Sequence, residues 1–326
     1  PPVGEAGHFV TSPHVHPVFA DLLRFALDEL RQALGSPDPF PIVELGAGDG
    51  TLARQLLDGF AEAGPVAVEY TAVEISPGAR DGLAGLPVRV LERVEDLETD
   101  PVCVFANELL DNLPFRRVIP TDDGPREIRV GAEGTTLVEI LVEPDEELLG
   151  RGERGTIIPT GAIDLLDRLA PRIRGYLLLI DYGSDEPSAE ADVHGYHEHR
   201  VIEDVLTDPG SRDITAGVDL REVRSRAEAH GLRSLGYVTQ RAALGALGFE
   251  RWERGQIDRQ AHALSSGRSE DAIGAWQSRQ RSRPLVDPGG LGRLRWLLLG
   301  RPPLGSPPWL ERAAARPSAD PPRSPT

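Results

Sequence analysis

The sequence predicts an α/β fold with a mostly parallel twisted sheet, helices on both faces, and inserted hairpin and helical segments. Short apolar runs at 41–45, 67–73 and 102–106 alternate with segments of helical periodicity, as in parallel strands joined by crossover helices. The first run ends in a glycine turn at 46–50, after which a helix is expected to start at Thr51. The 326 residues, 40% of them hydrophobic, are enough to bury a core of this size.

Composition restricts the partners and the compartment. A formal charge of −17 repels phosphate, so neither nucleic acid nor an anionic membrane is an expected partner, whereas a basic or arginine-bearing protein segment fits. The single cysteine, Cys103, cannot form an internal disulfide, which favours an intracellular, cytoplasmic location. It lies in an apolar run and is expected to be a buried hydrophobe. No apolar run is long enough to cross a membrane.

The elements follow from periodicity and from the positions of glycine and proline. Helices are expected over 19–34, from Thr51 to near Gly59 or Gly64, and over 78–84, 162–169, 220–230 and 240–247, with a polar helical region at 249–280. Strands are expected over 41–45, 67–73, 88–91, 102–106, 175–180 and 233–239, with a closing strand at 291–299. Residues 1–17 are expected to form an ordered loop.

The expected domain spans residues 1–300. Its core covers about 17–115 and 156–248, followed by a helical and closing segment at 249–300. Residues 116–155 contain a predicted hairpin, 127–130 with 136–142, and form an insertion that is a candidate cover for a substrate. The Pro-, Ser- and Arg-rich tail at 301–326 is predicted to be disordered.

The glycine turn distinguishes between cofactor classes. A dinucleotide-binding turn, G-x-G-x-x-G, would need glycine at position 51, which is Thr51. The sequence instead has E-x-G-x-G-x-G, with Glu44 before the turn; the alternative is a tight connection without a ligand. After the second strand, Glu74 is placed to accept hydrogen bonds from two ribose hydroxyls. Ser76-Pro77 is typical of a helix cap, and both interpretations can hold together.

The fourth strand is followed by Asn107 and Glu108, with Asp111 three residues further on. Ligand and catalytic groups in open α/β sheets gather at such carboxyl ends of strands. If this stretch is helical, the two carboxylates share a face and can hold a guanidinium as a fork. The alternative is a solvated helix start whose acids complement the helix dipole.

Histidines cluster near the N-terminus and around position 198. His8, His14 and His16 have no standard zinc spacing and no nearby cysteine. His197 and His199 are better explained by a surface loop. We therefore expect no metal.

Taken together in order, several segments resemble the MidA family of methyltransferases. They are 7–17, 44–50, 70–76, 107–114, 180–183, 209–220, 239–240 and 287–292. The resemblance implies a Rossmann-type class I methyltransferase fold and S-adenosyl-L-methionine (SAM) as cofactor. It also implies a possible substrate class, because the family's characterised mitochondrial member methylates an arginine of a respiratory-complex subunit.

The same resemblance implies the residues of the site. Near the cofactor it places Glu44, Gly46, Ala47, Gly48, Gly50, Glu74, Ile75, Ser76 and Asn107, with Glu44 helping to hold the cofactor's ammonium. For catalysis it implies Glu108, Asp111, Asp181 and Tyr182. For substrate contacts it implies Thr11, Ser12, Pro13, Tyr196, Asp213, Thr215 and Asp219. The run at 191–194, Ala-Asp-Val-His, departs from the family pattern.

The predicted activity is methyl transfer by in-line attack of a nucleophile on the sulfonium methyl of SAM. The protein then supplies position, a dry site and a group that keeps the nucleophile unprotonated. The first hypothesis is protein arginine methylation, with Glu108 and Asp111 holding the guanidinium. The departure at 191–194 motivates a second, a small-molecule O- or N-methyltransferase. A third is a non-catalytic assembly factor that acts by docking. The oligomeric state stays open.

Overall fold

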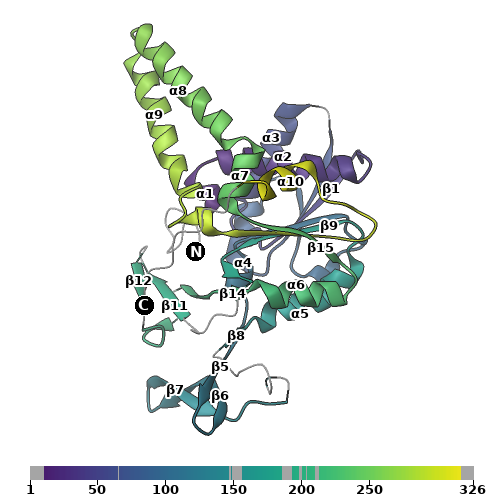
Figure 1. Ribbon diagram of the computed structural model, residues 1–326, viewed down its shortest axis with the longest axis vertical. Helices are drawn as coiled ribbons and strands as arrows, with labels where there is room; N and C mark the ends of the chain where they lie inside the picture. Colours follow the sequence, from purple (N-terminus) through teal and green to yellow (C-terminus); the bar gives the residue numbers. More distant parts are fainter. Residues whose placement is uncertain are drawn as a thin grey trace.

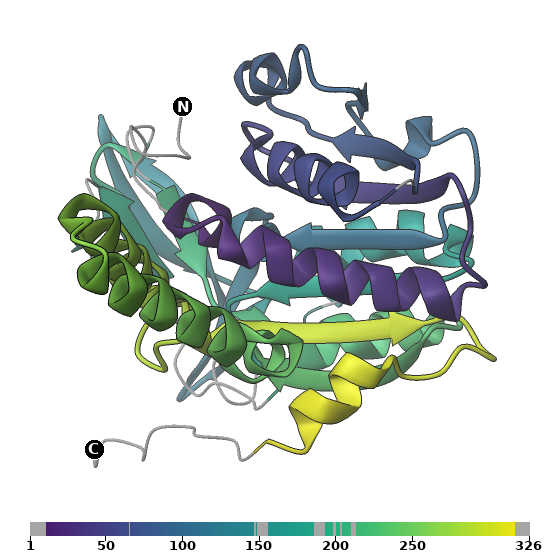
Figure 2. The same cartoon turned by 90° about the horizontal axis from the view of Figure 1, so that it is seen from above.

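The computed structural model describes residues 11–64, 66–146, 148, 156–185, 193–197, 200–202, 204–209 and 213–316. At its centre lies a seven-stranded sheet in the order β15-β16-β9-β4-β1-β2-β3 (Figures 1 and 2). Its strands are β1 (Phe40–Leu45), β2 (Val68–Val73), β3 (Val88–Leu91), β4 (Cys103–Asn107), β9 (Tyr176–Asp181), β15 (Arg233–Thr239) and β16 (Arg295–Gly300). Only β16 runs antiparallel to its neighbours. The predicted mostly parallel α/β fold is confirmed.

Helices cover both faces of this sheet (Figures 1 and 2). One face is covered by α2 (Val18–Ala33), α3 (Thr51–Ala63), α7 (Gln240–Leu247) and α10 (Pro308–Ala314), and the other by α5 (Thr160–Leu169) and α6 (Leu220–Ala229). Side chains alternate between the two faces along β1. Phe40 and Ile42 pack in the core beneath α2, and Val43 and Leu45 pack in the core beneath α5. In α2, buried residues recur three and four apart, which explains the helix predicted there.

The smaller elements surround the carboxyl ends of the strands. They are α1 (Ser12–Val15), α4 (Pro77–Leu83), β10 (Gly183–Ser184), β11 (Val193–His197), β12 (Arg200–Ile202), β13 (Asp213–Ala216) and β14 (Val218–Asp219). Strands β12, β11 and β13 form one small sheet, and β10 pairs with β14. Within residues 11–17, the described part of the predicted N-terminal loop, Ser12–Val15 forms the short helix α1.

Two C-terminal elements differ from prediction in their bounds. The polar helical region is a hairpin of two helices, α8 (Phe249–Ser265) and α9 (Ser269–Ser282), which projects from the body (Figure 1). The helices are separated at Gly267, whose φ of +72° suits glycine. The closing strand begins at Arg295 because Leu291–Arg293 forms a 3-10 turn.

The prediction of a disordered tail is wrong for the part of it that forms α10. Trp309 in this helix is fully buried, with its ring centroid 5.6 Å from that of Trp296. Arg301 donates hydrogen bonds to the carbonyls of Ile173 at 2.9 Å and Ala170 at 2.6 Å. Burial of Trp309 and the hydrogen bonds of Arg301 outweigh the Pro-rich composition on which disorder was predicted. Residues 317–326 lie outside the described ranges.

Trp309→Ala should lower the free energy of unfolding by about 3–5 kcal/mol, because it removes a large buried aromatic side chain. Trp276→Ala is the matched control, since Trp276 is 47% exposed on α9 and should contribute less than about 1 kcal/mol. Urea unfolding of the two variants measures the difference. Equal losses would contradict an anchoring role for α10.

The insertion forms a separate four-stranded sheet, in the order β7-β6-β5-β8, at the opposite end of the molecule from the α8–α9 hairpin (Figure 1). The predicted hairpin is confirmed as β6 (Gly124–Glu133) and β7 (Thr136–Val142). Two strands were missed: β5 (Arg116–Thr121), which contains a proline, and β8 (Thr156–Ile158), which is too short for a periodic pattern. β8 carries the insertion past its predicted end at 155.

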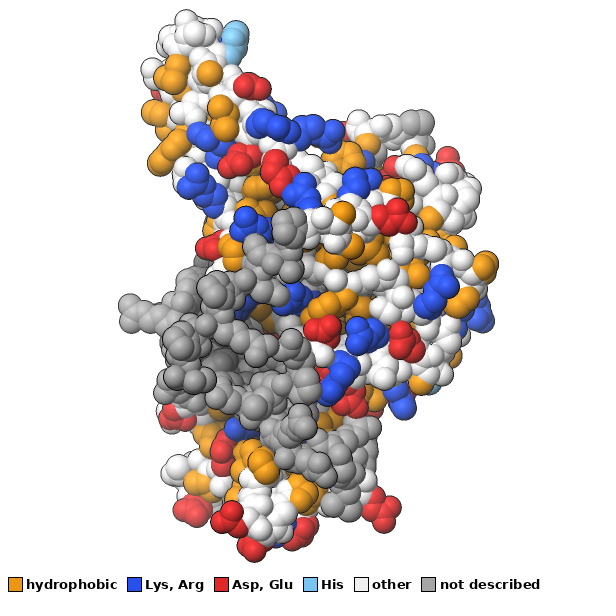
Figure 3. Space-filling model, in the orientation of Figure 1, with side chains coloured by type: hydrophobic (Ala, Val, Ile, Leu, Met, Phe, Trp, Pro, Cys, Tyr) orange, Lys and Arg blue, Asp and Glu red, His pale blue; other side chains and the backbone are white. Residues whose placement is uncertain are grey.

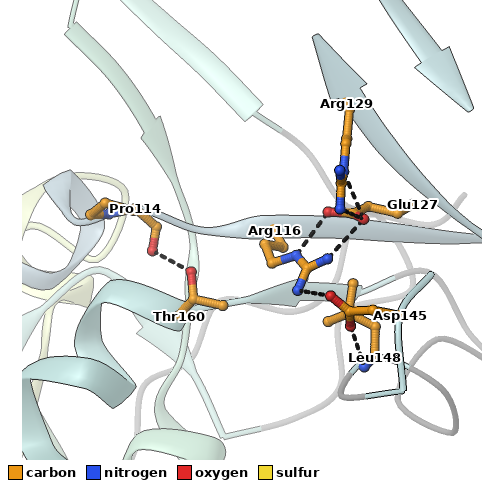
Figure 4. Close-up of polar contacts among 7 residues, drawn as sticks. All are labelled: Pro114, Arg116, Glu127, Arg129, Asp145, Leu148 and Thr160. Carbon is orange, nitrogen blue, oxygen red and sulfur yellow. Dashed lines mark hydrogen bonds and ion pairs between the residues drawn. The ribbon is translucent and has the colours of Figure 1, made fainter. Parts of the chain in front are cut away.

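An ion network fixes the base of this sheet (Figure 4). Arg116 donates to both carboxylate oxygens of the buried Glu127, each at 2.8 Å, and pairs with Asp145 at 2.8 Å. Arg129 contacts the same Glu127 carboxylate at 2.9 Å. These hydrogen bonds, foremost that of Arg116, lower the pKa of Glu127 to about 2. The network therefore holds β5 and β6 together with the segment that follows β7.

Glu127→Ala should destabilise the fold by about 2 kcal/mol, because it removes hydrogen bonds to a charged partner. Glu143→Ala is the control: that side chain is 78% exposed beside Arg126 and should contribute less than about 1 kcal/mol. The folded-state pKa of Glu127 is depressed, so its contribution is present above the unfolded value of about 4.3 and is lost as the pH falls toward 2. Denaturant unfolding near neutral pH and in acid checks both the size and the sign. An effect that grows on acidification would contradict the assignment.

Candidate active site

The predicted site residues gather where four neighbouring strands end. The glycine turn follows β1, Glu74 follows β2, Asn107 and Glu108 lie at the end of β4, and Asp181 ends β9. The sheet order reverses direction at β1, which has β2 on one side and β4 on the other. Such a switch point is where open α/β sheets bind ligands. The structure thus brings together residues that are far apart in the sequence.

Glycine is required at each of three positions in the turn. Gly46, Gly48 and Gly50 have φ values of +68°, +55° and +77°, which L side chains rarely adopt. A Cβ at Gly46 would lie 2.7 Å from Leu109 Cδ1, and one at Gly50 would lie 2.9 Å from Leu83 Cδ2. At Gly48 a Cβ would meet no described atom within 4 Å. The backbone at Gly48 is therefore open to close approach by a ligand.

Glu74 braces the turn from the end of β2. Its Oε2 accepts a hydrogen bond from the Gly48 N–H at 2.8 Å, and its Oε1 accepts one from the Ser76 N–H at 2.8 Å. Ser76 caps α4, its hydroxyl accepting from the Ala79 N–H at 3.5 Å, so the predicted helix cap is confirmed. Ile75 between them is 74% exposed, which leaves apolar surface next to the Glu74 carboxylate.

Glu44, predicted to hold the ammonium of the cofactor, is buried between β1 and β2. Its side chain is 3% exposed, and its Oε2 accepts a hydrogen bond from the Tyr70 hydroxyl at 2.7 Å. Burial is the main reason that the pKa of Glu44 rises to about 8. The carboxyl therefore joins β1 to β2 inside the core. A contact with the ammonium of a cofactor stays a prediction.

Three buried acids occupy the ends of β4 and β9. Glu108, Asp111 and Asp181 are 7%, 4% and 1% exposed. In the described part of the chain, no arginine or histidine forms an ion pair with any of them. This burial contradicts the alternative of a solvated helix start. The prediction that Glu108 and Asp111 share one face of a helix is also wrong, because the 3-10 turn Leu110–Asn112 begins only after Glu108.

Glu108 has one satisfied and one unsatisfied oxygen. Its Oε1 accepts from the Ser12 N–H at 2.8 Å and from Asn107 Nδ2 at 3.1 Å. Its Oε2 and the Asn107 Oδ1 are buried, and neither has a hydrogen-bond partner among the described residues. Glu108 also has a φ of +52°, unusual for a residue with a side chain. Two buried acceptors without donors mark a place where a ligand's N–H groups could bind.

Asp111 and Asp181 are held by the surrounding backbone and side chains. Asp181 Oδ2 accepts from the N–H groups of Leu109 at 3.0 Å and Leu110 at 2.6 Å. Asp111 Oδ2 accepts from the Thr215 hydroxyl at 3.1 Å. Burial raises the pKa of Glu108 to about 7 and that of Asp111 to about 6. Burial, followed by the Asp111 carboxyl, raises the pKa of Asp181 well above its usual range.

The short helix α1 ties the acids to the glycine turn. His14 contacts Thr11 Oγ1 through Nδ1 at 2.8 Å and Asp49 Oδ2 through Nε2 at 3.0 Å. The contact with His14 is the main cause that lowers the pKa of Asp49 to about 2. The Pro13 carbonyl accepts from Gln55 Nε2 at 3.2 Å. The predicted segment Thr11-Ser12-Pro13 thus lies beside both the turn and Glu108.

Gln240 lies in this region but was not among the predicted site residues. It is fully buried and donates from Nε2 to Ser12 Oγ at 3.3 Å and to the Leu285 carbonyl at 3.1 Å. Its Oε1 accepts from the Trp296 indole at 3.3 Å. Gln240 therefore fixes Ser12, whose N–H binds Glu108. Thr239-Gln240 belongs to a segment of the family resemblance, and this was the only signal available.

The remaining predicted residues differ in whether they contact the buried acids. Thr215 contacts Asp111, whereas Asp219 caps α6 by accepting from the Glu222 N–H at 3.1 Å. The Tyr182 ring has the Arg293 guanidinium 5.2 Å from its centroid. The backbones of Tyr196 and Asp213 pair across β11 and β13, and their side chains lie outside the description.

The described ranges contain no group of three or more His, Cys, Asp or Glu side chains arranged for a metal ion. His8 and His199 lie outside those ranges. Of the helices that the structure describes, none combines the length and apolarity needed to cross a membrane.

Known proteins resemble the chain in sequence and in fold. A family model described as "Putative S-adenosyl-L-methionine-dependent methyltransferase" matches residues 24–238. The mitochondrial protein arginine methyltransferases NDUFAF7 of Rattus norvegicus and Homo sapiens are 29% and 26% identical over 294 residues, covering 76% of this chain. The chain spans just under two thirds of their lengths, 66% and 65%.

A solved structure extends the likeness to nearly the whole chain. It is a superfamily member from Burkholderia thailandensis bound to S-adenosyl-homocysteine, 25% identical, with a TM-score of 0.78. The match covers 97% of this chain and 84% of that one. A native structure from the same organism, 24% identical, has the same TM-score of 0.78 and supports the fold.

Proposed function

The chain belongs to the family of S-adenosyl-L-methionine-dependent methyltransferases, and from this premise we propose that it methylates an arginine side chain of a protein. One observation carries the proposal: Glu108 Oε2 and Asn107 Oδ1 are buried acceptors without donors, next to the carboxyls of Asp111 and Asp181. A guanidinium fits them, because it carries a positive charge and five N–H donors in a planar fork. The curated relatives named above are protein arginine methyltransferases, which agrees with this acceptor.

The residues at the glycine turn fit SAM. Gly48 leaves open space for close approach of the cofactor's amino-acid part. Each Glu74 oxygen accepts one hydrogen bond from the described residues and can accept a second from a ribose hydroxyl. Ile75 offers exposed apolar surface beside it. When bound, SAM supplies a methyl group that is activated by the neighbouring positive sulfonium.

The acids then position the acceptor, and a carboxylate among them can take the proton that the acceptor's nitrogen loses on methylation. In their ionised forms, Glu108 and Asp111 would orient the guanidinium and favour a nitrogen lone pair directed at the methyl group. Asp181, held by three backbone N–H groups, would keep this segment in place. Burial of all three side chains excludes water, so each charge interaction is stronger than in solvent.

Transfer of a tritiated methyl group from SAM to the proteins of a cell extract tests this function. After acid hydrolysis, label in methylarginine is the expected result. Label in another amino acid would contradict the arginine assignment, and label only in a small molecule would support the second hypothesis. That hypothesis rests on the run at 191–194, in which residues 191 and 192 lie outside the described ranges. A cytoplasmic location and the lack of a nucleic-acid partner stay predictions.

A further inference from the structure

The outer strand of the small sheet has features that natural sheet edges avoid. β7, Thr136–Val142, is an end strand of the order β7-β6-β5-β8. Its sequence, Thr-Leu-Val-Glu-Ile-Leu-Val, has five aliphatic residues and neither proline nor a basic residue. Ile140 and Leu141 are 41% and 54% exposed. Edge strands usually carry Lys, Pro or a bulge, because their free N–H and C=O groups otherwise pair with another strand.

The one charged side chain of β7 does not select a charged partner. Arg117 pairs with Glu139, the one charged residue of β7, and Arg126 pairs with Glu143 at 3.1 Å. Arg116 and Arg129 pair with Glu127 on the inner strand. On β7 itself, the surface left to recognise a partner consists of backbone groups and aliphatic side chains, because the exposed acids Asp122, Asp123 and Glu133 lie in the β5–β6 turn and on β6. Figure 3 shows such apolar side chains on the small sheet, at the bottom of the view.

We propose that β7 pairs antiparallel with β7 of a second copy of this chain across a two-fold axis. Identical strands suit this arrangement, because an isologous contact uses the same patch twice. A two-fold at Ile140 sets Val138 opposite Val142 and Ile140 opposite its counterpart, and Glu139 faces Leu141 rather than another acid. The aliphatic residues of the two edges then cover one another.

The position of the small sheet allows this contact, and its other edge limits the assembly to two copies. Figure 1 shows the small sheet projecting away from the central body, so two copies can meet there without their central sheets in contact. The joined sheet would end at β8 on both sides, a strand of only three residues paired to β5 over Thr156–Ile158. Short edges of this kind resist further addition. The pairing therefore gives a closed dimer, not an open chain of strands.

An arginine-bearing acceptor segment is the rival occupant of β7. The buried acids that favour such a segment lie at the ends of β4 and β9, whereas the one acid of β7 is already paired with Arg117. The charges thus favour the buried acids as the site of the acceptor and leave β7 to a neutral, aliphatic partner. The dimer does not depend on the proposed function.

Sedimentation velocity of the full chain over a range of concentrations tests the proposal, with a mass of twice 35.3 kDa expected at the higher concentrations. Ile140→Glu should shift the protein to the monomer mass, because two like charges would face each other across the axis. Within one copy the new carboxylate lies opposite Arg129, so the hairpin keeps a favourable pair. Leu141→Glu is a second edge variant with the same expected result, because the new carboxylate would face Glu139 of the other copy.

Val130→Lys is the matched control. Val130 is 58% exposed on the inner strand β6, where the lysine would lie opposite Glu139. It should leave the dimer intact. A monomer at every concentration, a dimer that survives both edge substitutions, or equal dissociation by Val130→Lys would overturn the proposal. Calorimetric binding of SAM, expected to be unchanged in the monomeric variants, confirms that they are folded.

Discussion

Glu108→Gln should reduce methyl transfer by at least about 100-fold while SAM binding stays unchanged. The substitution keeps the size of the side chain but removes the negative charge that a guanidinium requires, and it turns N–H donors toward the donors of the acceptor. In Glu108→Gln the amide oxygen can still accept from the Ser12 N–H and from Asn107 Nδ2, and Glu108 forms no hydrogen bond with the described glycine turn, so the cofactor site should be intact. Turnover is measured as tritium transfer to extract proteins, and SAM affinity by calorimetry.

Glu98→Gln is the control for this experiment, because Glu98 forms an exposed pair with Arg89 and precedes β4, whereas Glu108 follows that strand. It should behave as the unmodified protein. Normal turnover in Glu108→Gln would remove this residue from the mechanism. Loss of SAM binding in the same variant would mean that Glu108 belongs to the cofactor site instead.

Gly48→Val should abolish measurable SAM binding, a weakening of at least about 100-fold, or about 2.7 kcal/mol. At a φ of +55° a β-branched residue is strained, and its side chain would fill the open space beside the turn. Calorimetric titration with SAM and with S-adenosyl-homocysteine measures the effect.

Gly134→Val is the control that separates backbone strain from loss of the open space beside the glycine turn. Gly134 has a φ of +64° and no described atom within 4 Å of an added Cβ, but it lies in the β6–β7 turn. It should lower stability without changing SAM binding. Retained binding in Gly48→Val would place the cofactor elsewhere. Lost binding with intact biological function would favour the docking-factor hypothesis.

Local sequence patterns predicted the site residues that directly follow a strand. Glycine spacing and the apolar runs located the turn, Glu74 and Glu108, because parallel strands bring their carboxyl ends to one edge. The burial of Glu44 could not be predicted from alternation along β1. Alternation puts Glu44 on the same face as Phe40 and Ile42, but the opposite face of this central strand is buried as well.

Contacts between distant segments could not be predicted from local patterns. Ser12 and Glu108 are 96 residues apart, and Gln240 is 228 residues from Ser12, so no periodicity links them. Composition gave a wrong prediction at the tail, because the prolines around α10 indicated disorder, whereas Trp309 is buried against Trp296. Asp181 was predicted only through the family resemblance, since a single acid after an apolar strand has no distinctive spacing.

The most direct test is calorimetric titration of methylguanidinium into the protein saturated with S-adenosyl-homocysteine, one pH unit below and one above the Glu108 pKa of about 7. The raised pKa values of Glu108 and Asp111 mean that their carboxyls lose protons over this range, so a cation should bind more tightly at the higher pH. We expect severalfold tighter binding there and none in Glu108→Gln. No binding at either pH, or binding that Glu108→Gln leaves unchanged, would contradict a guanidinium site among these acids.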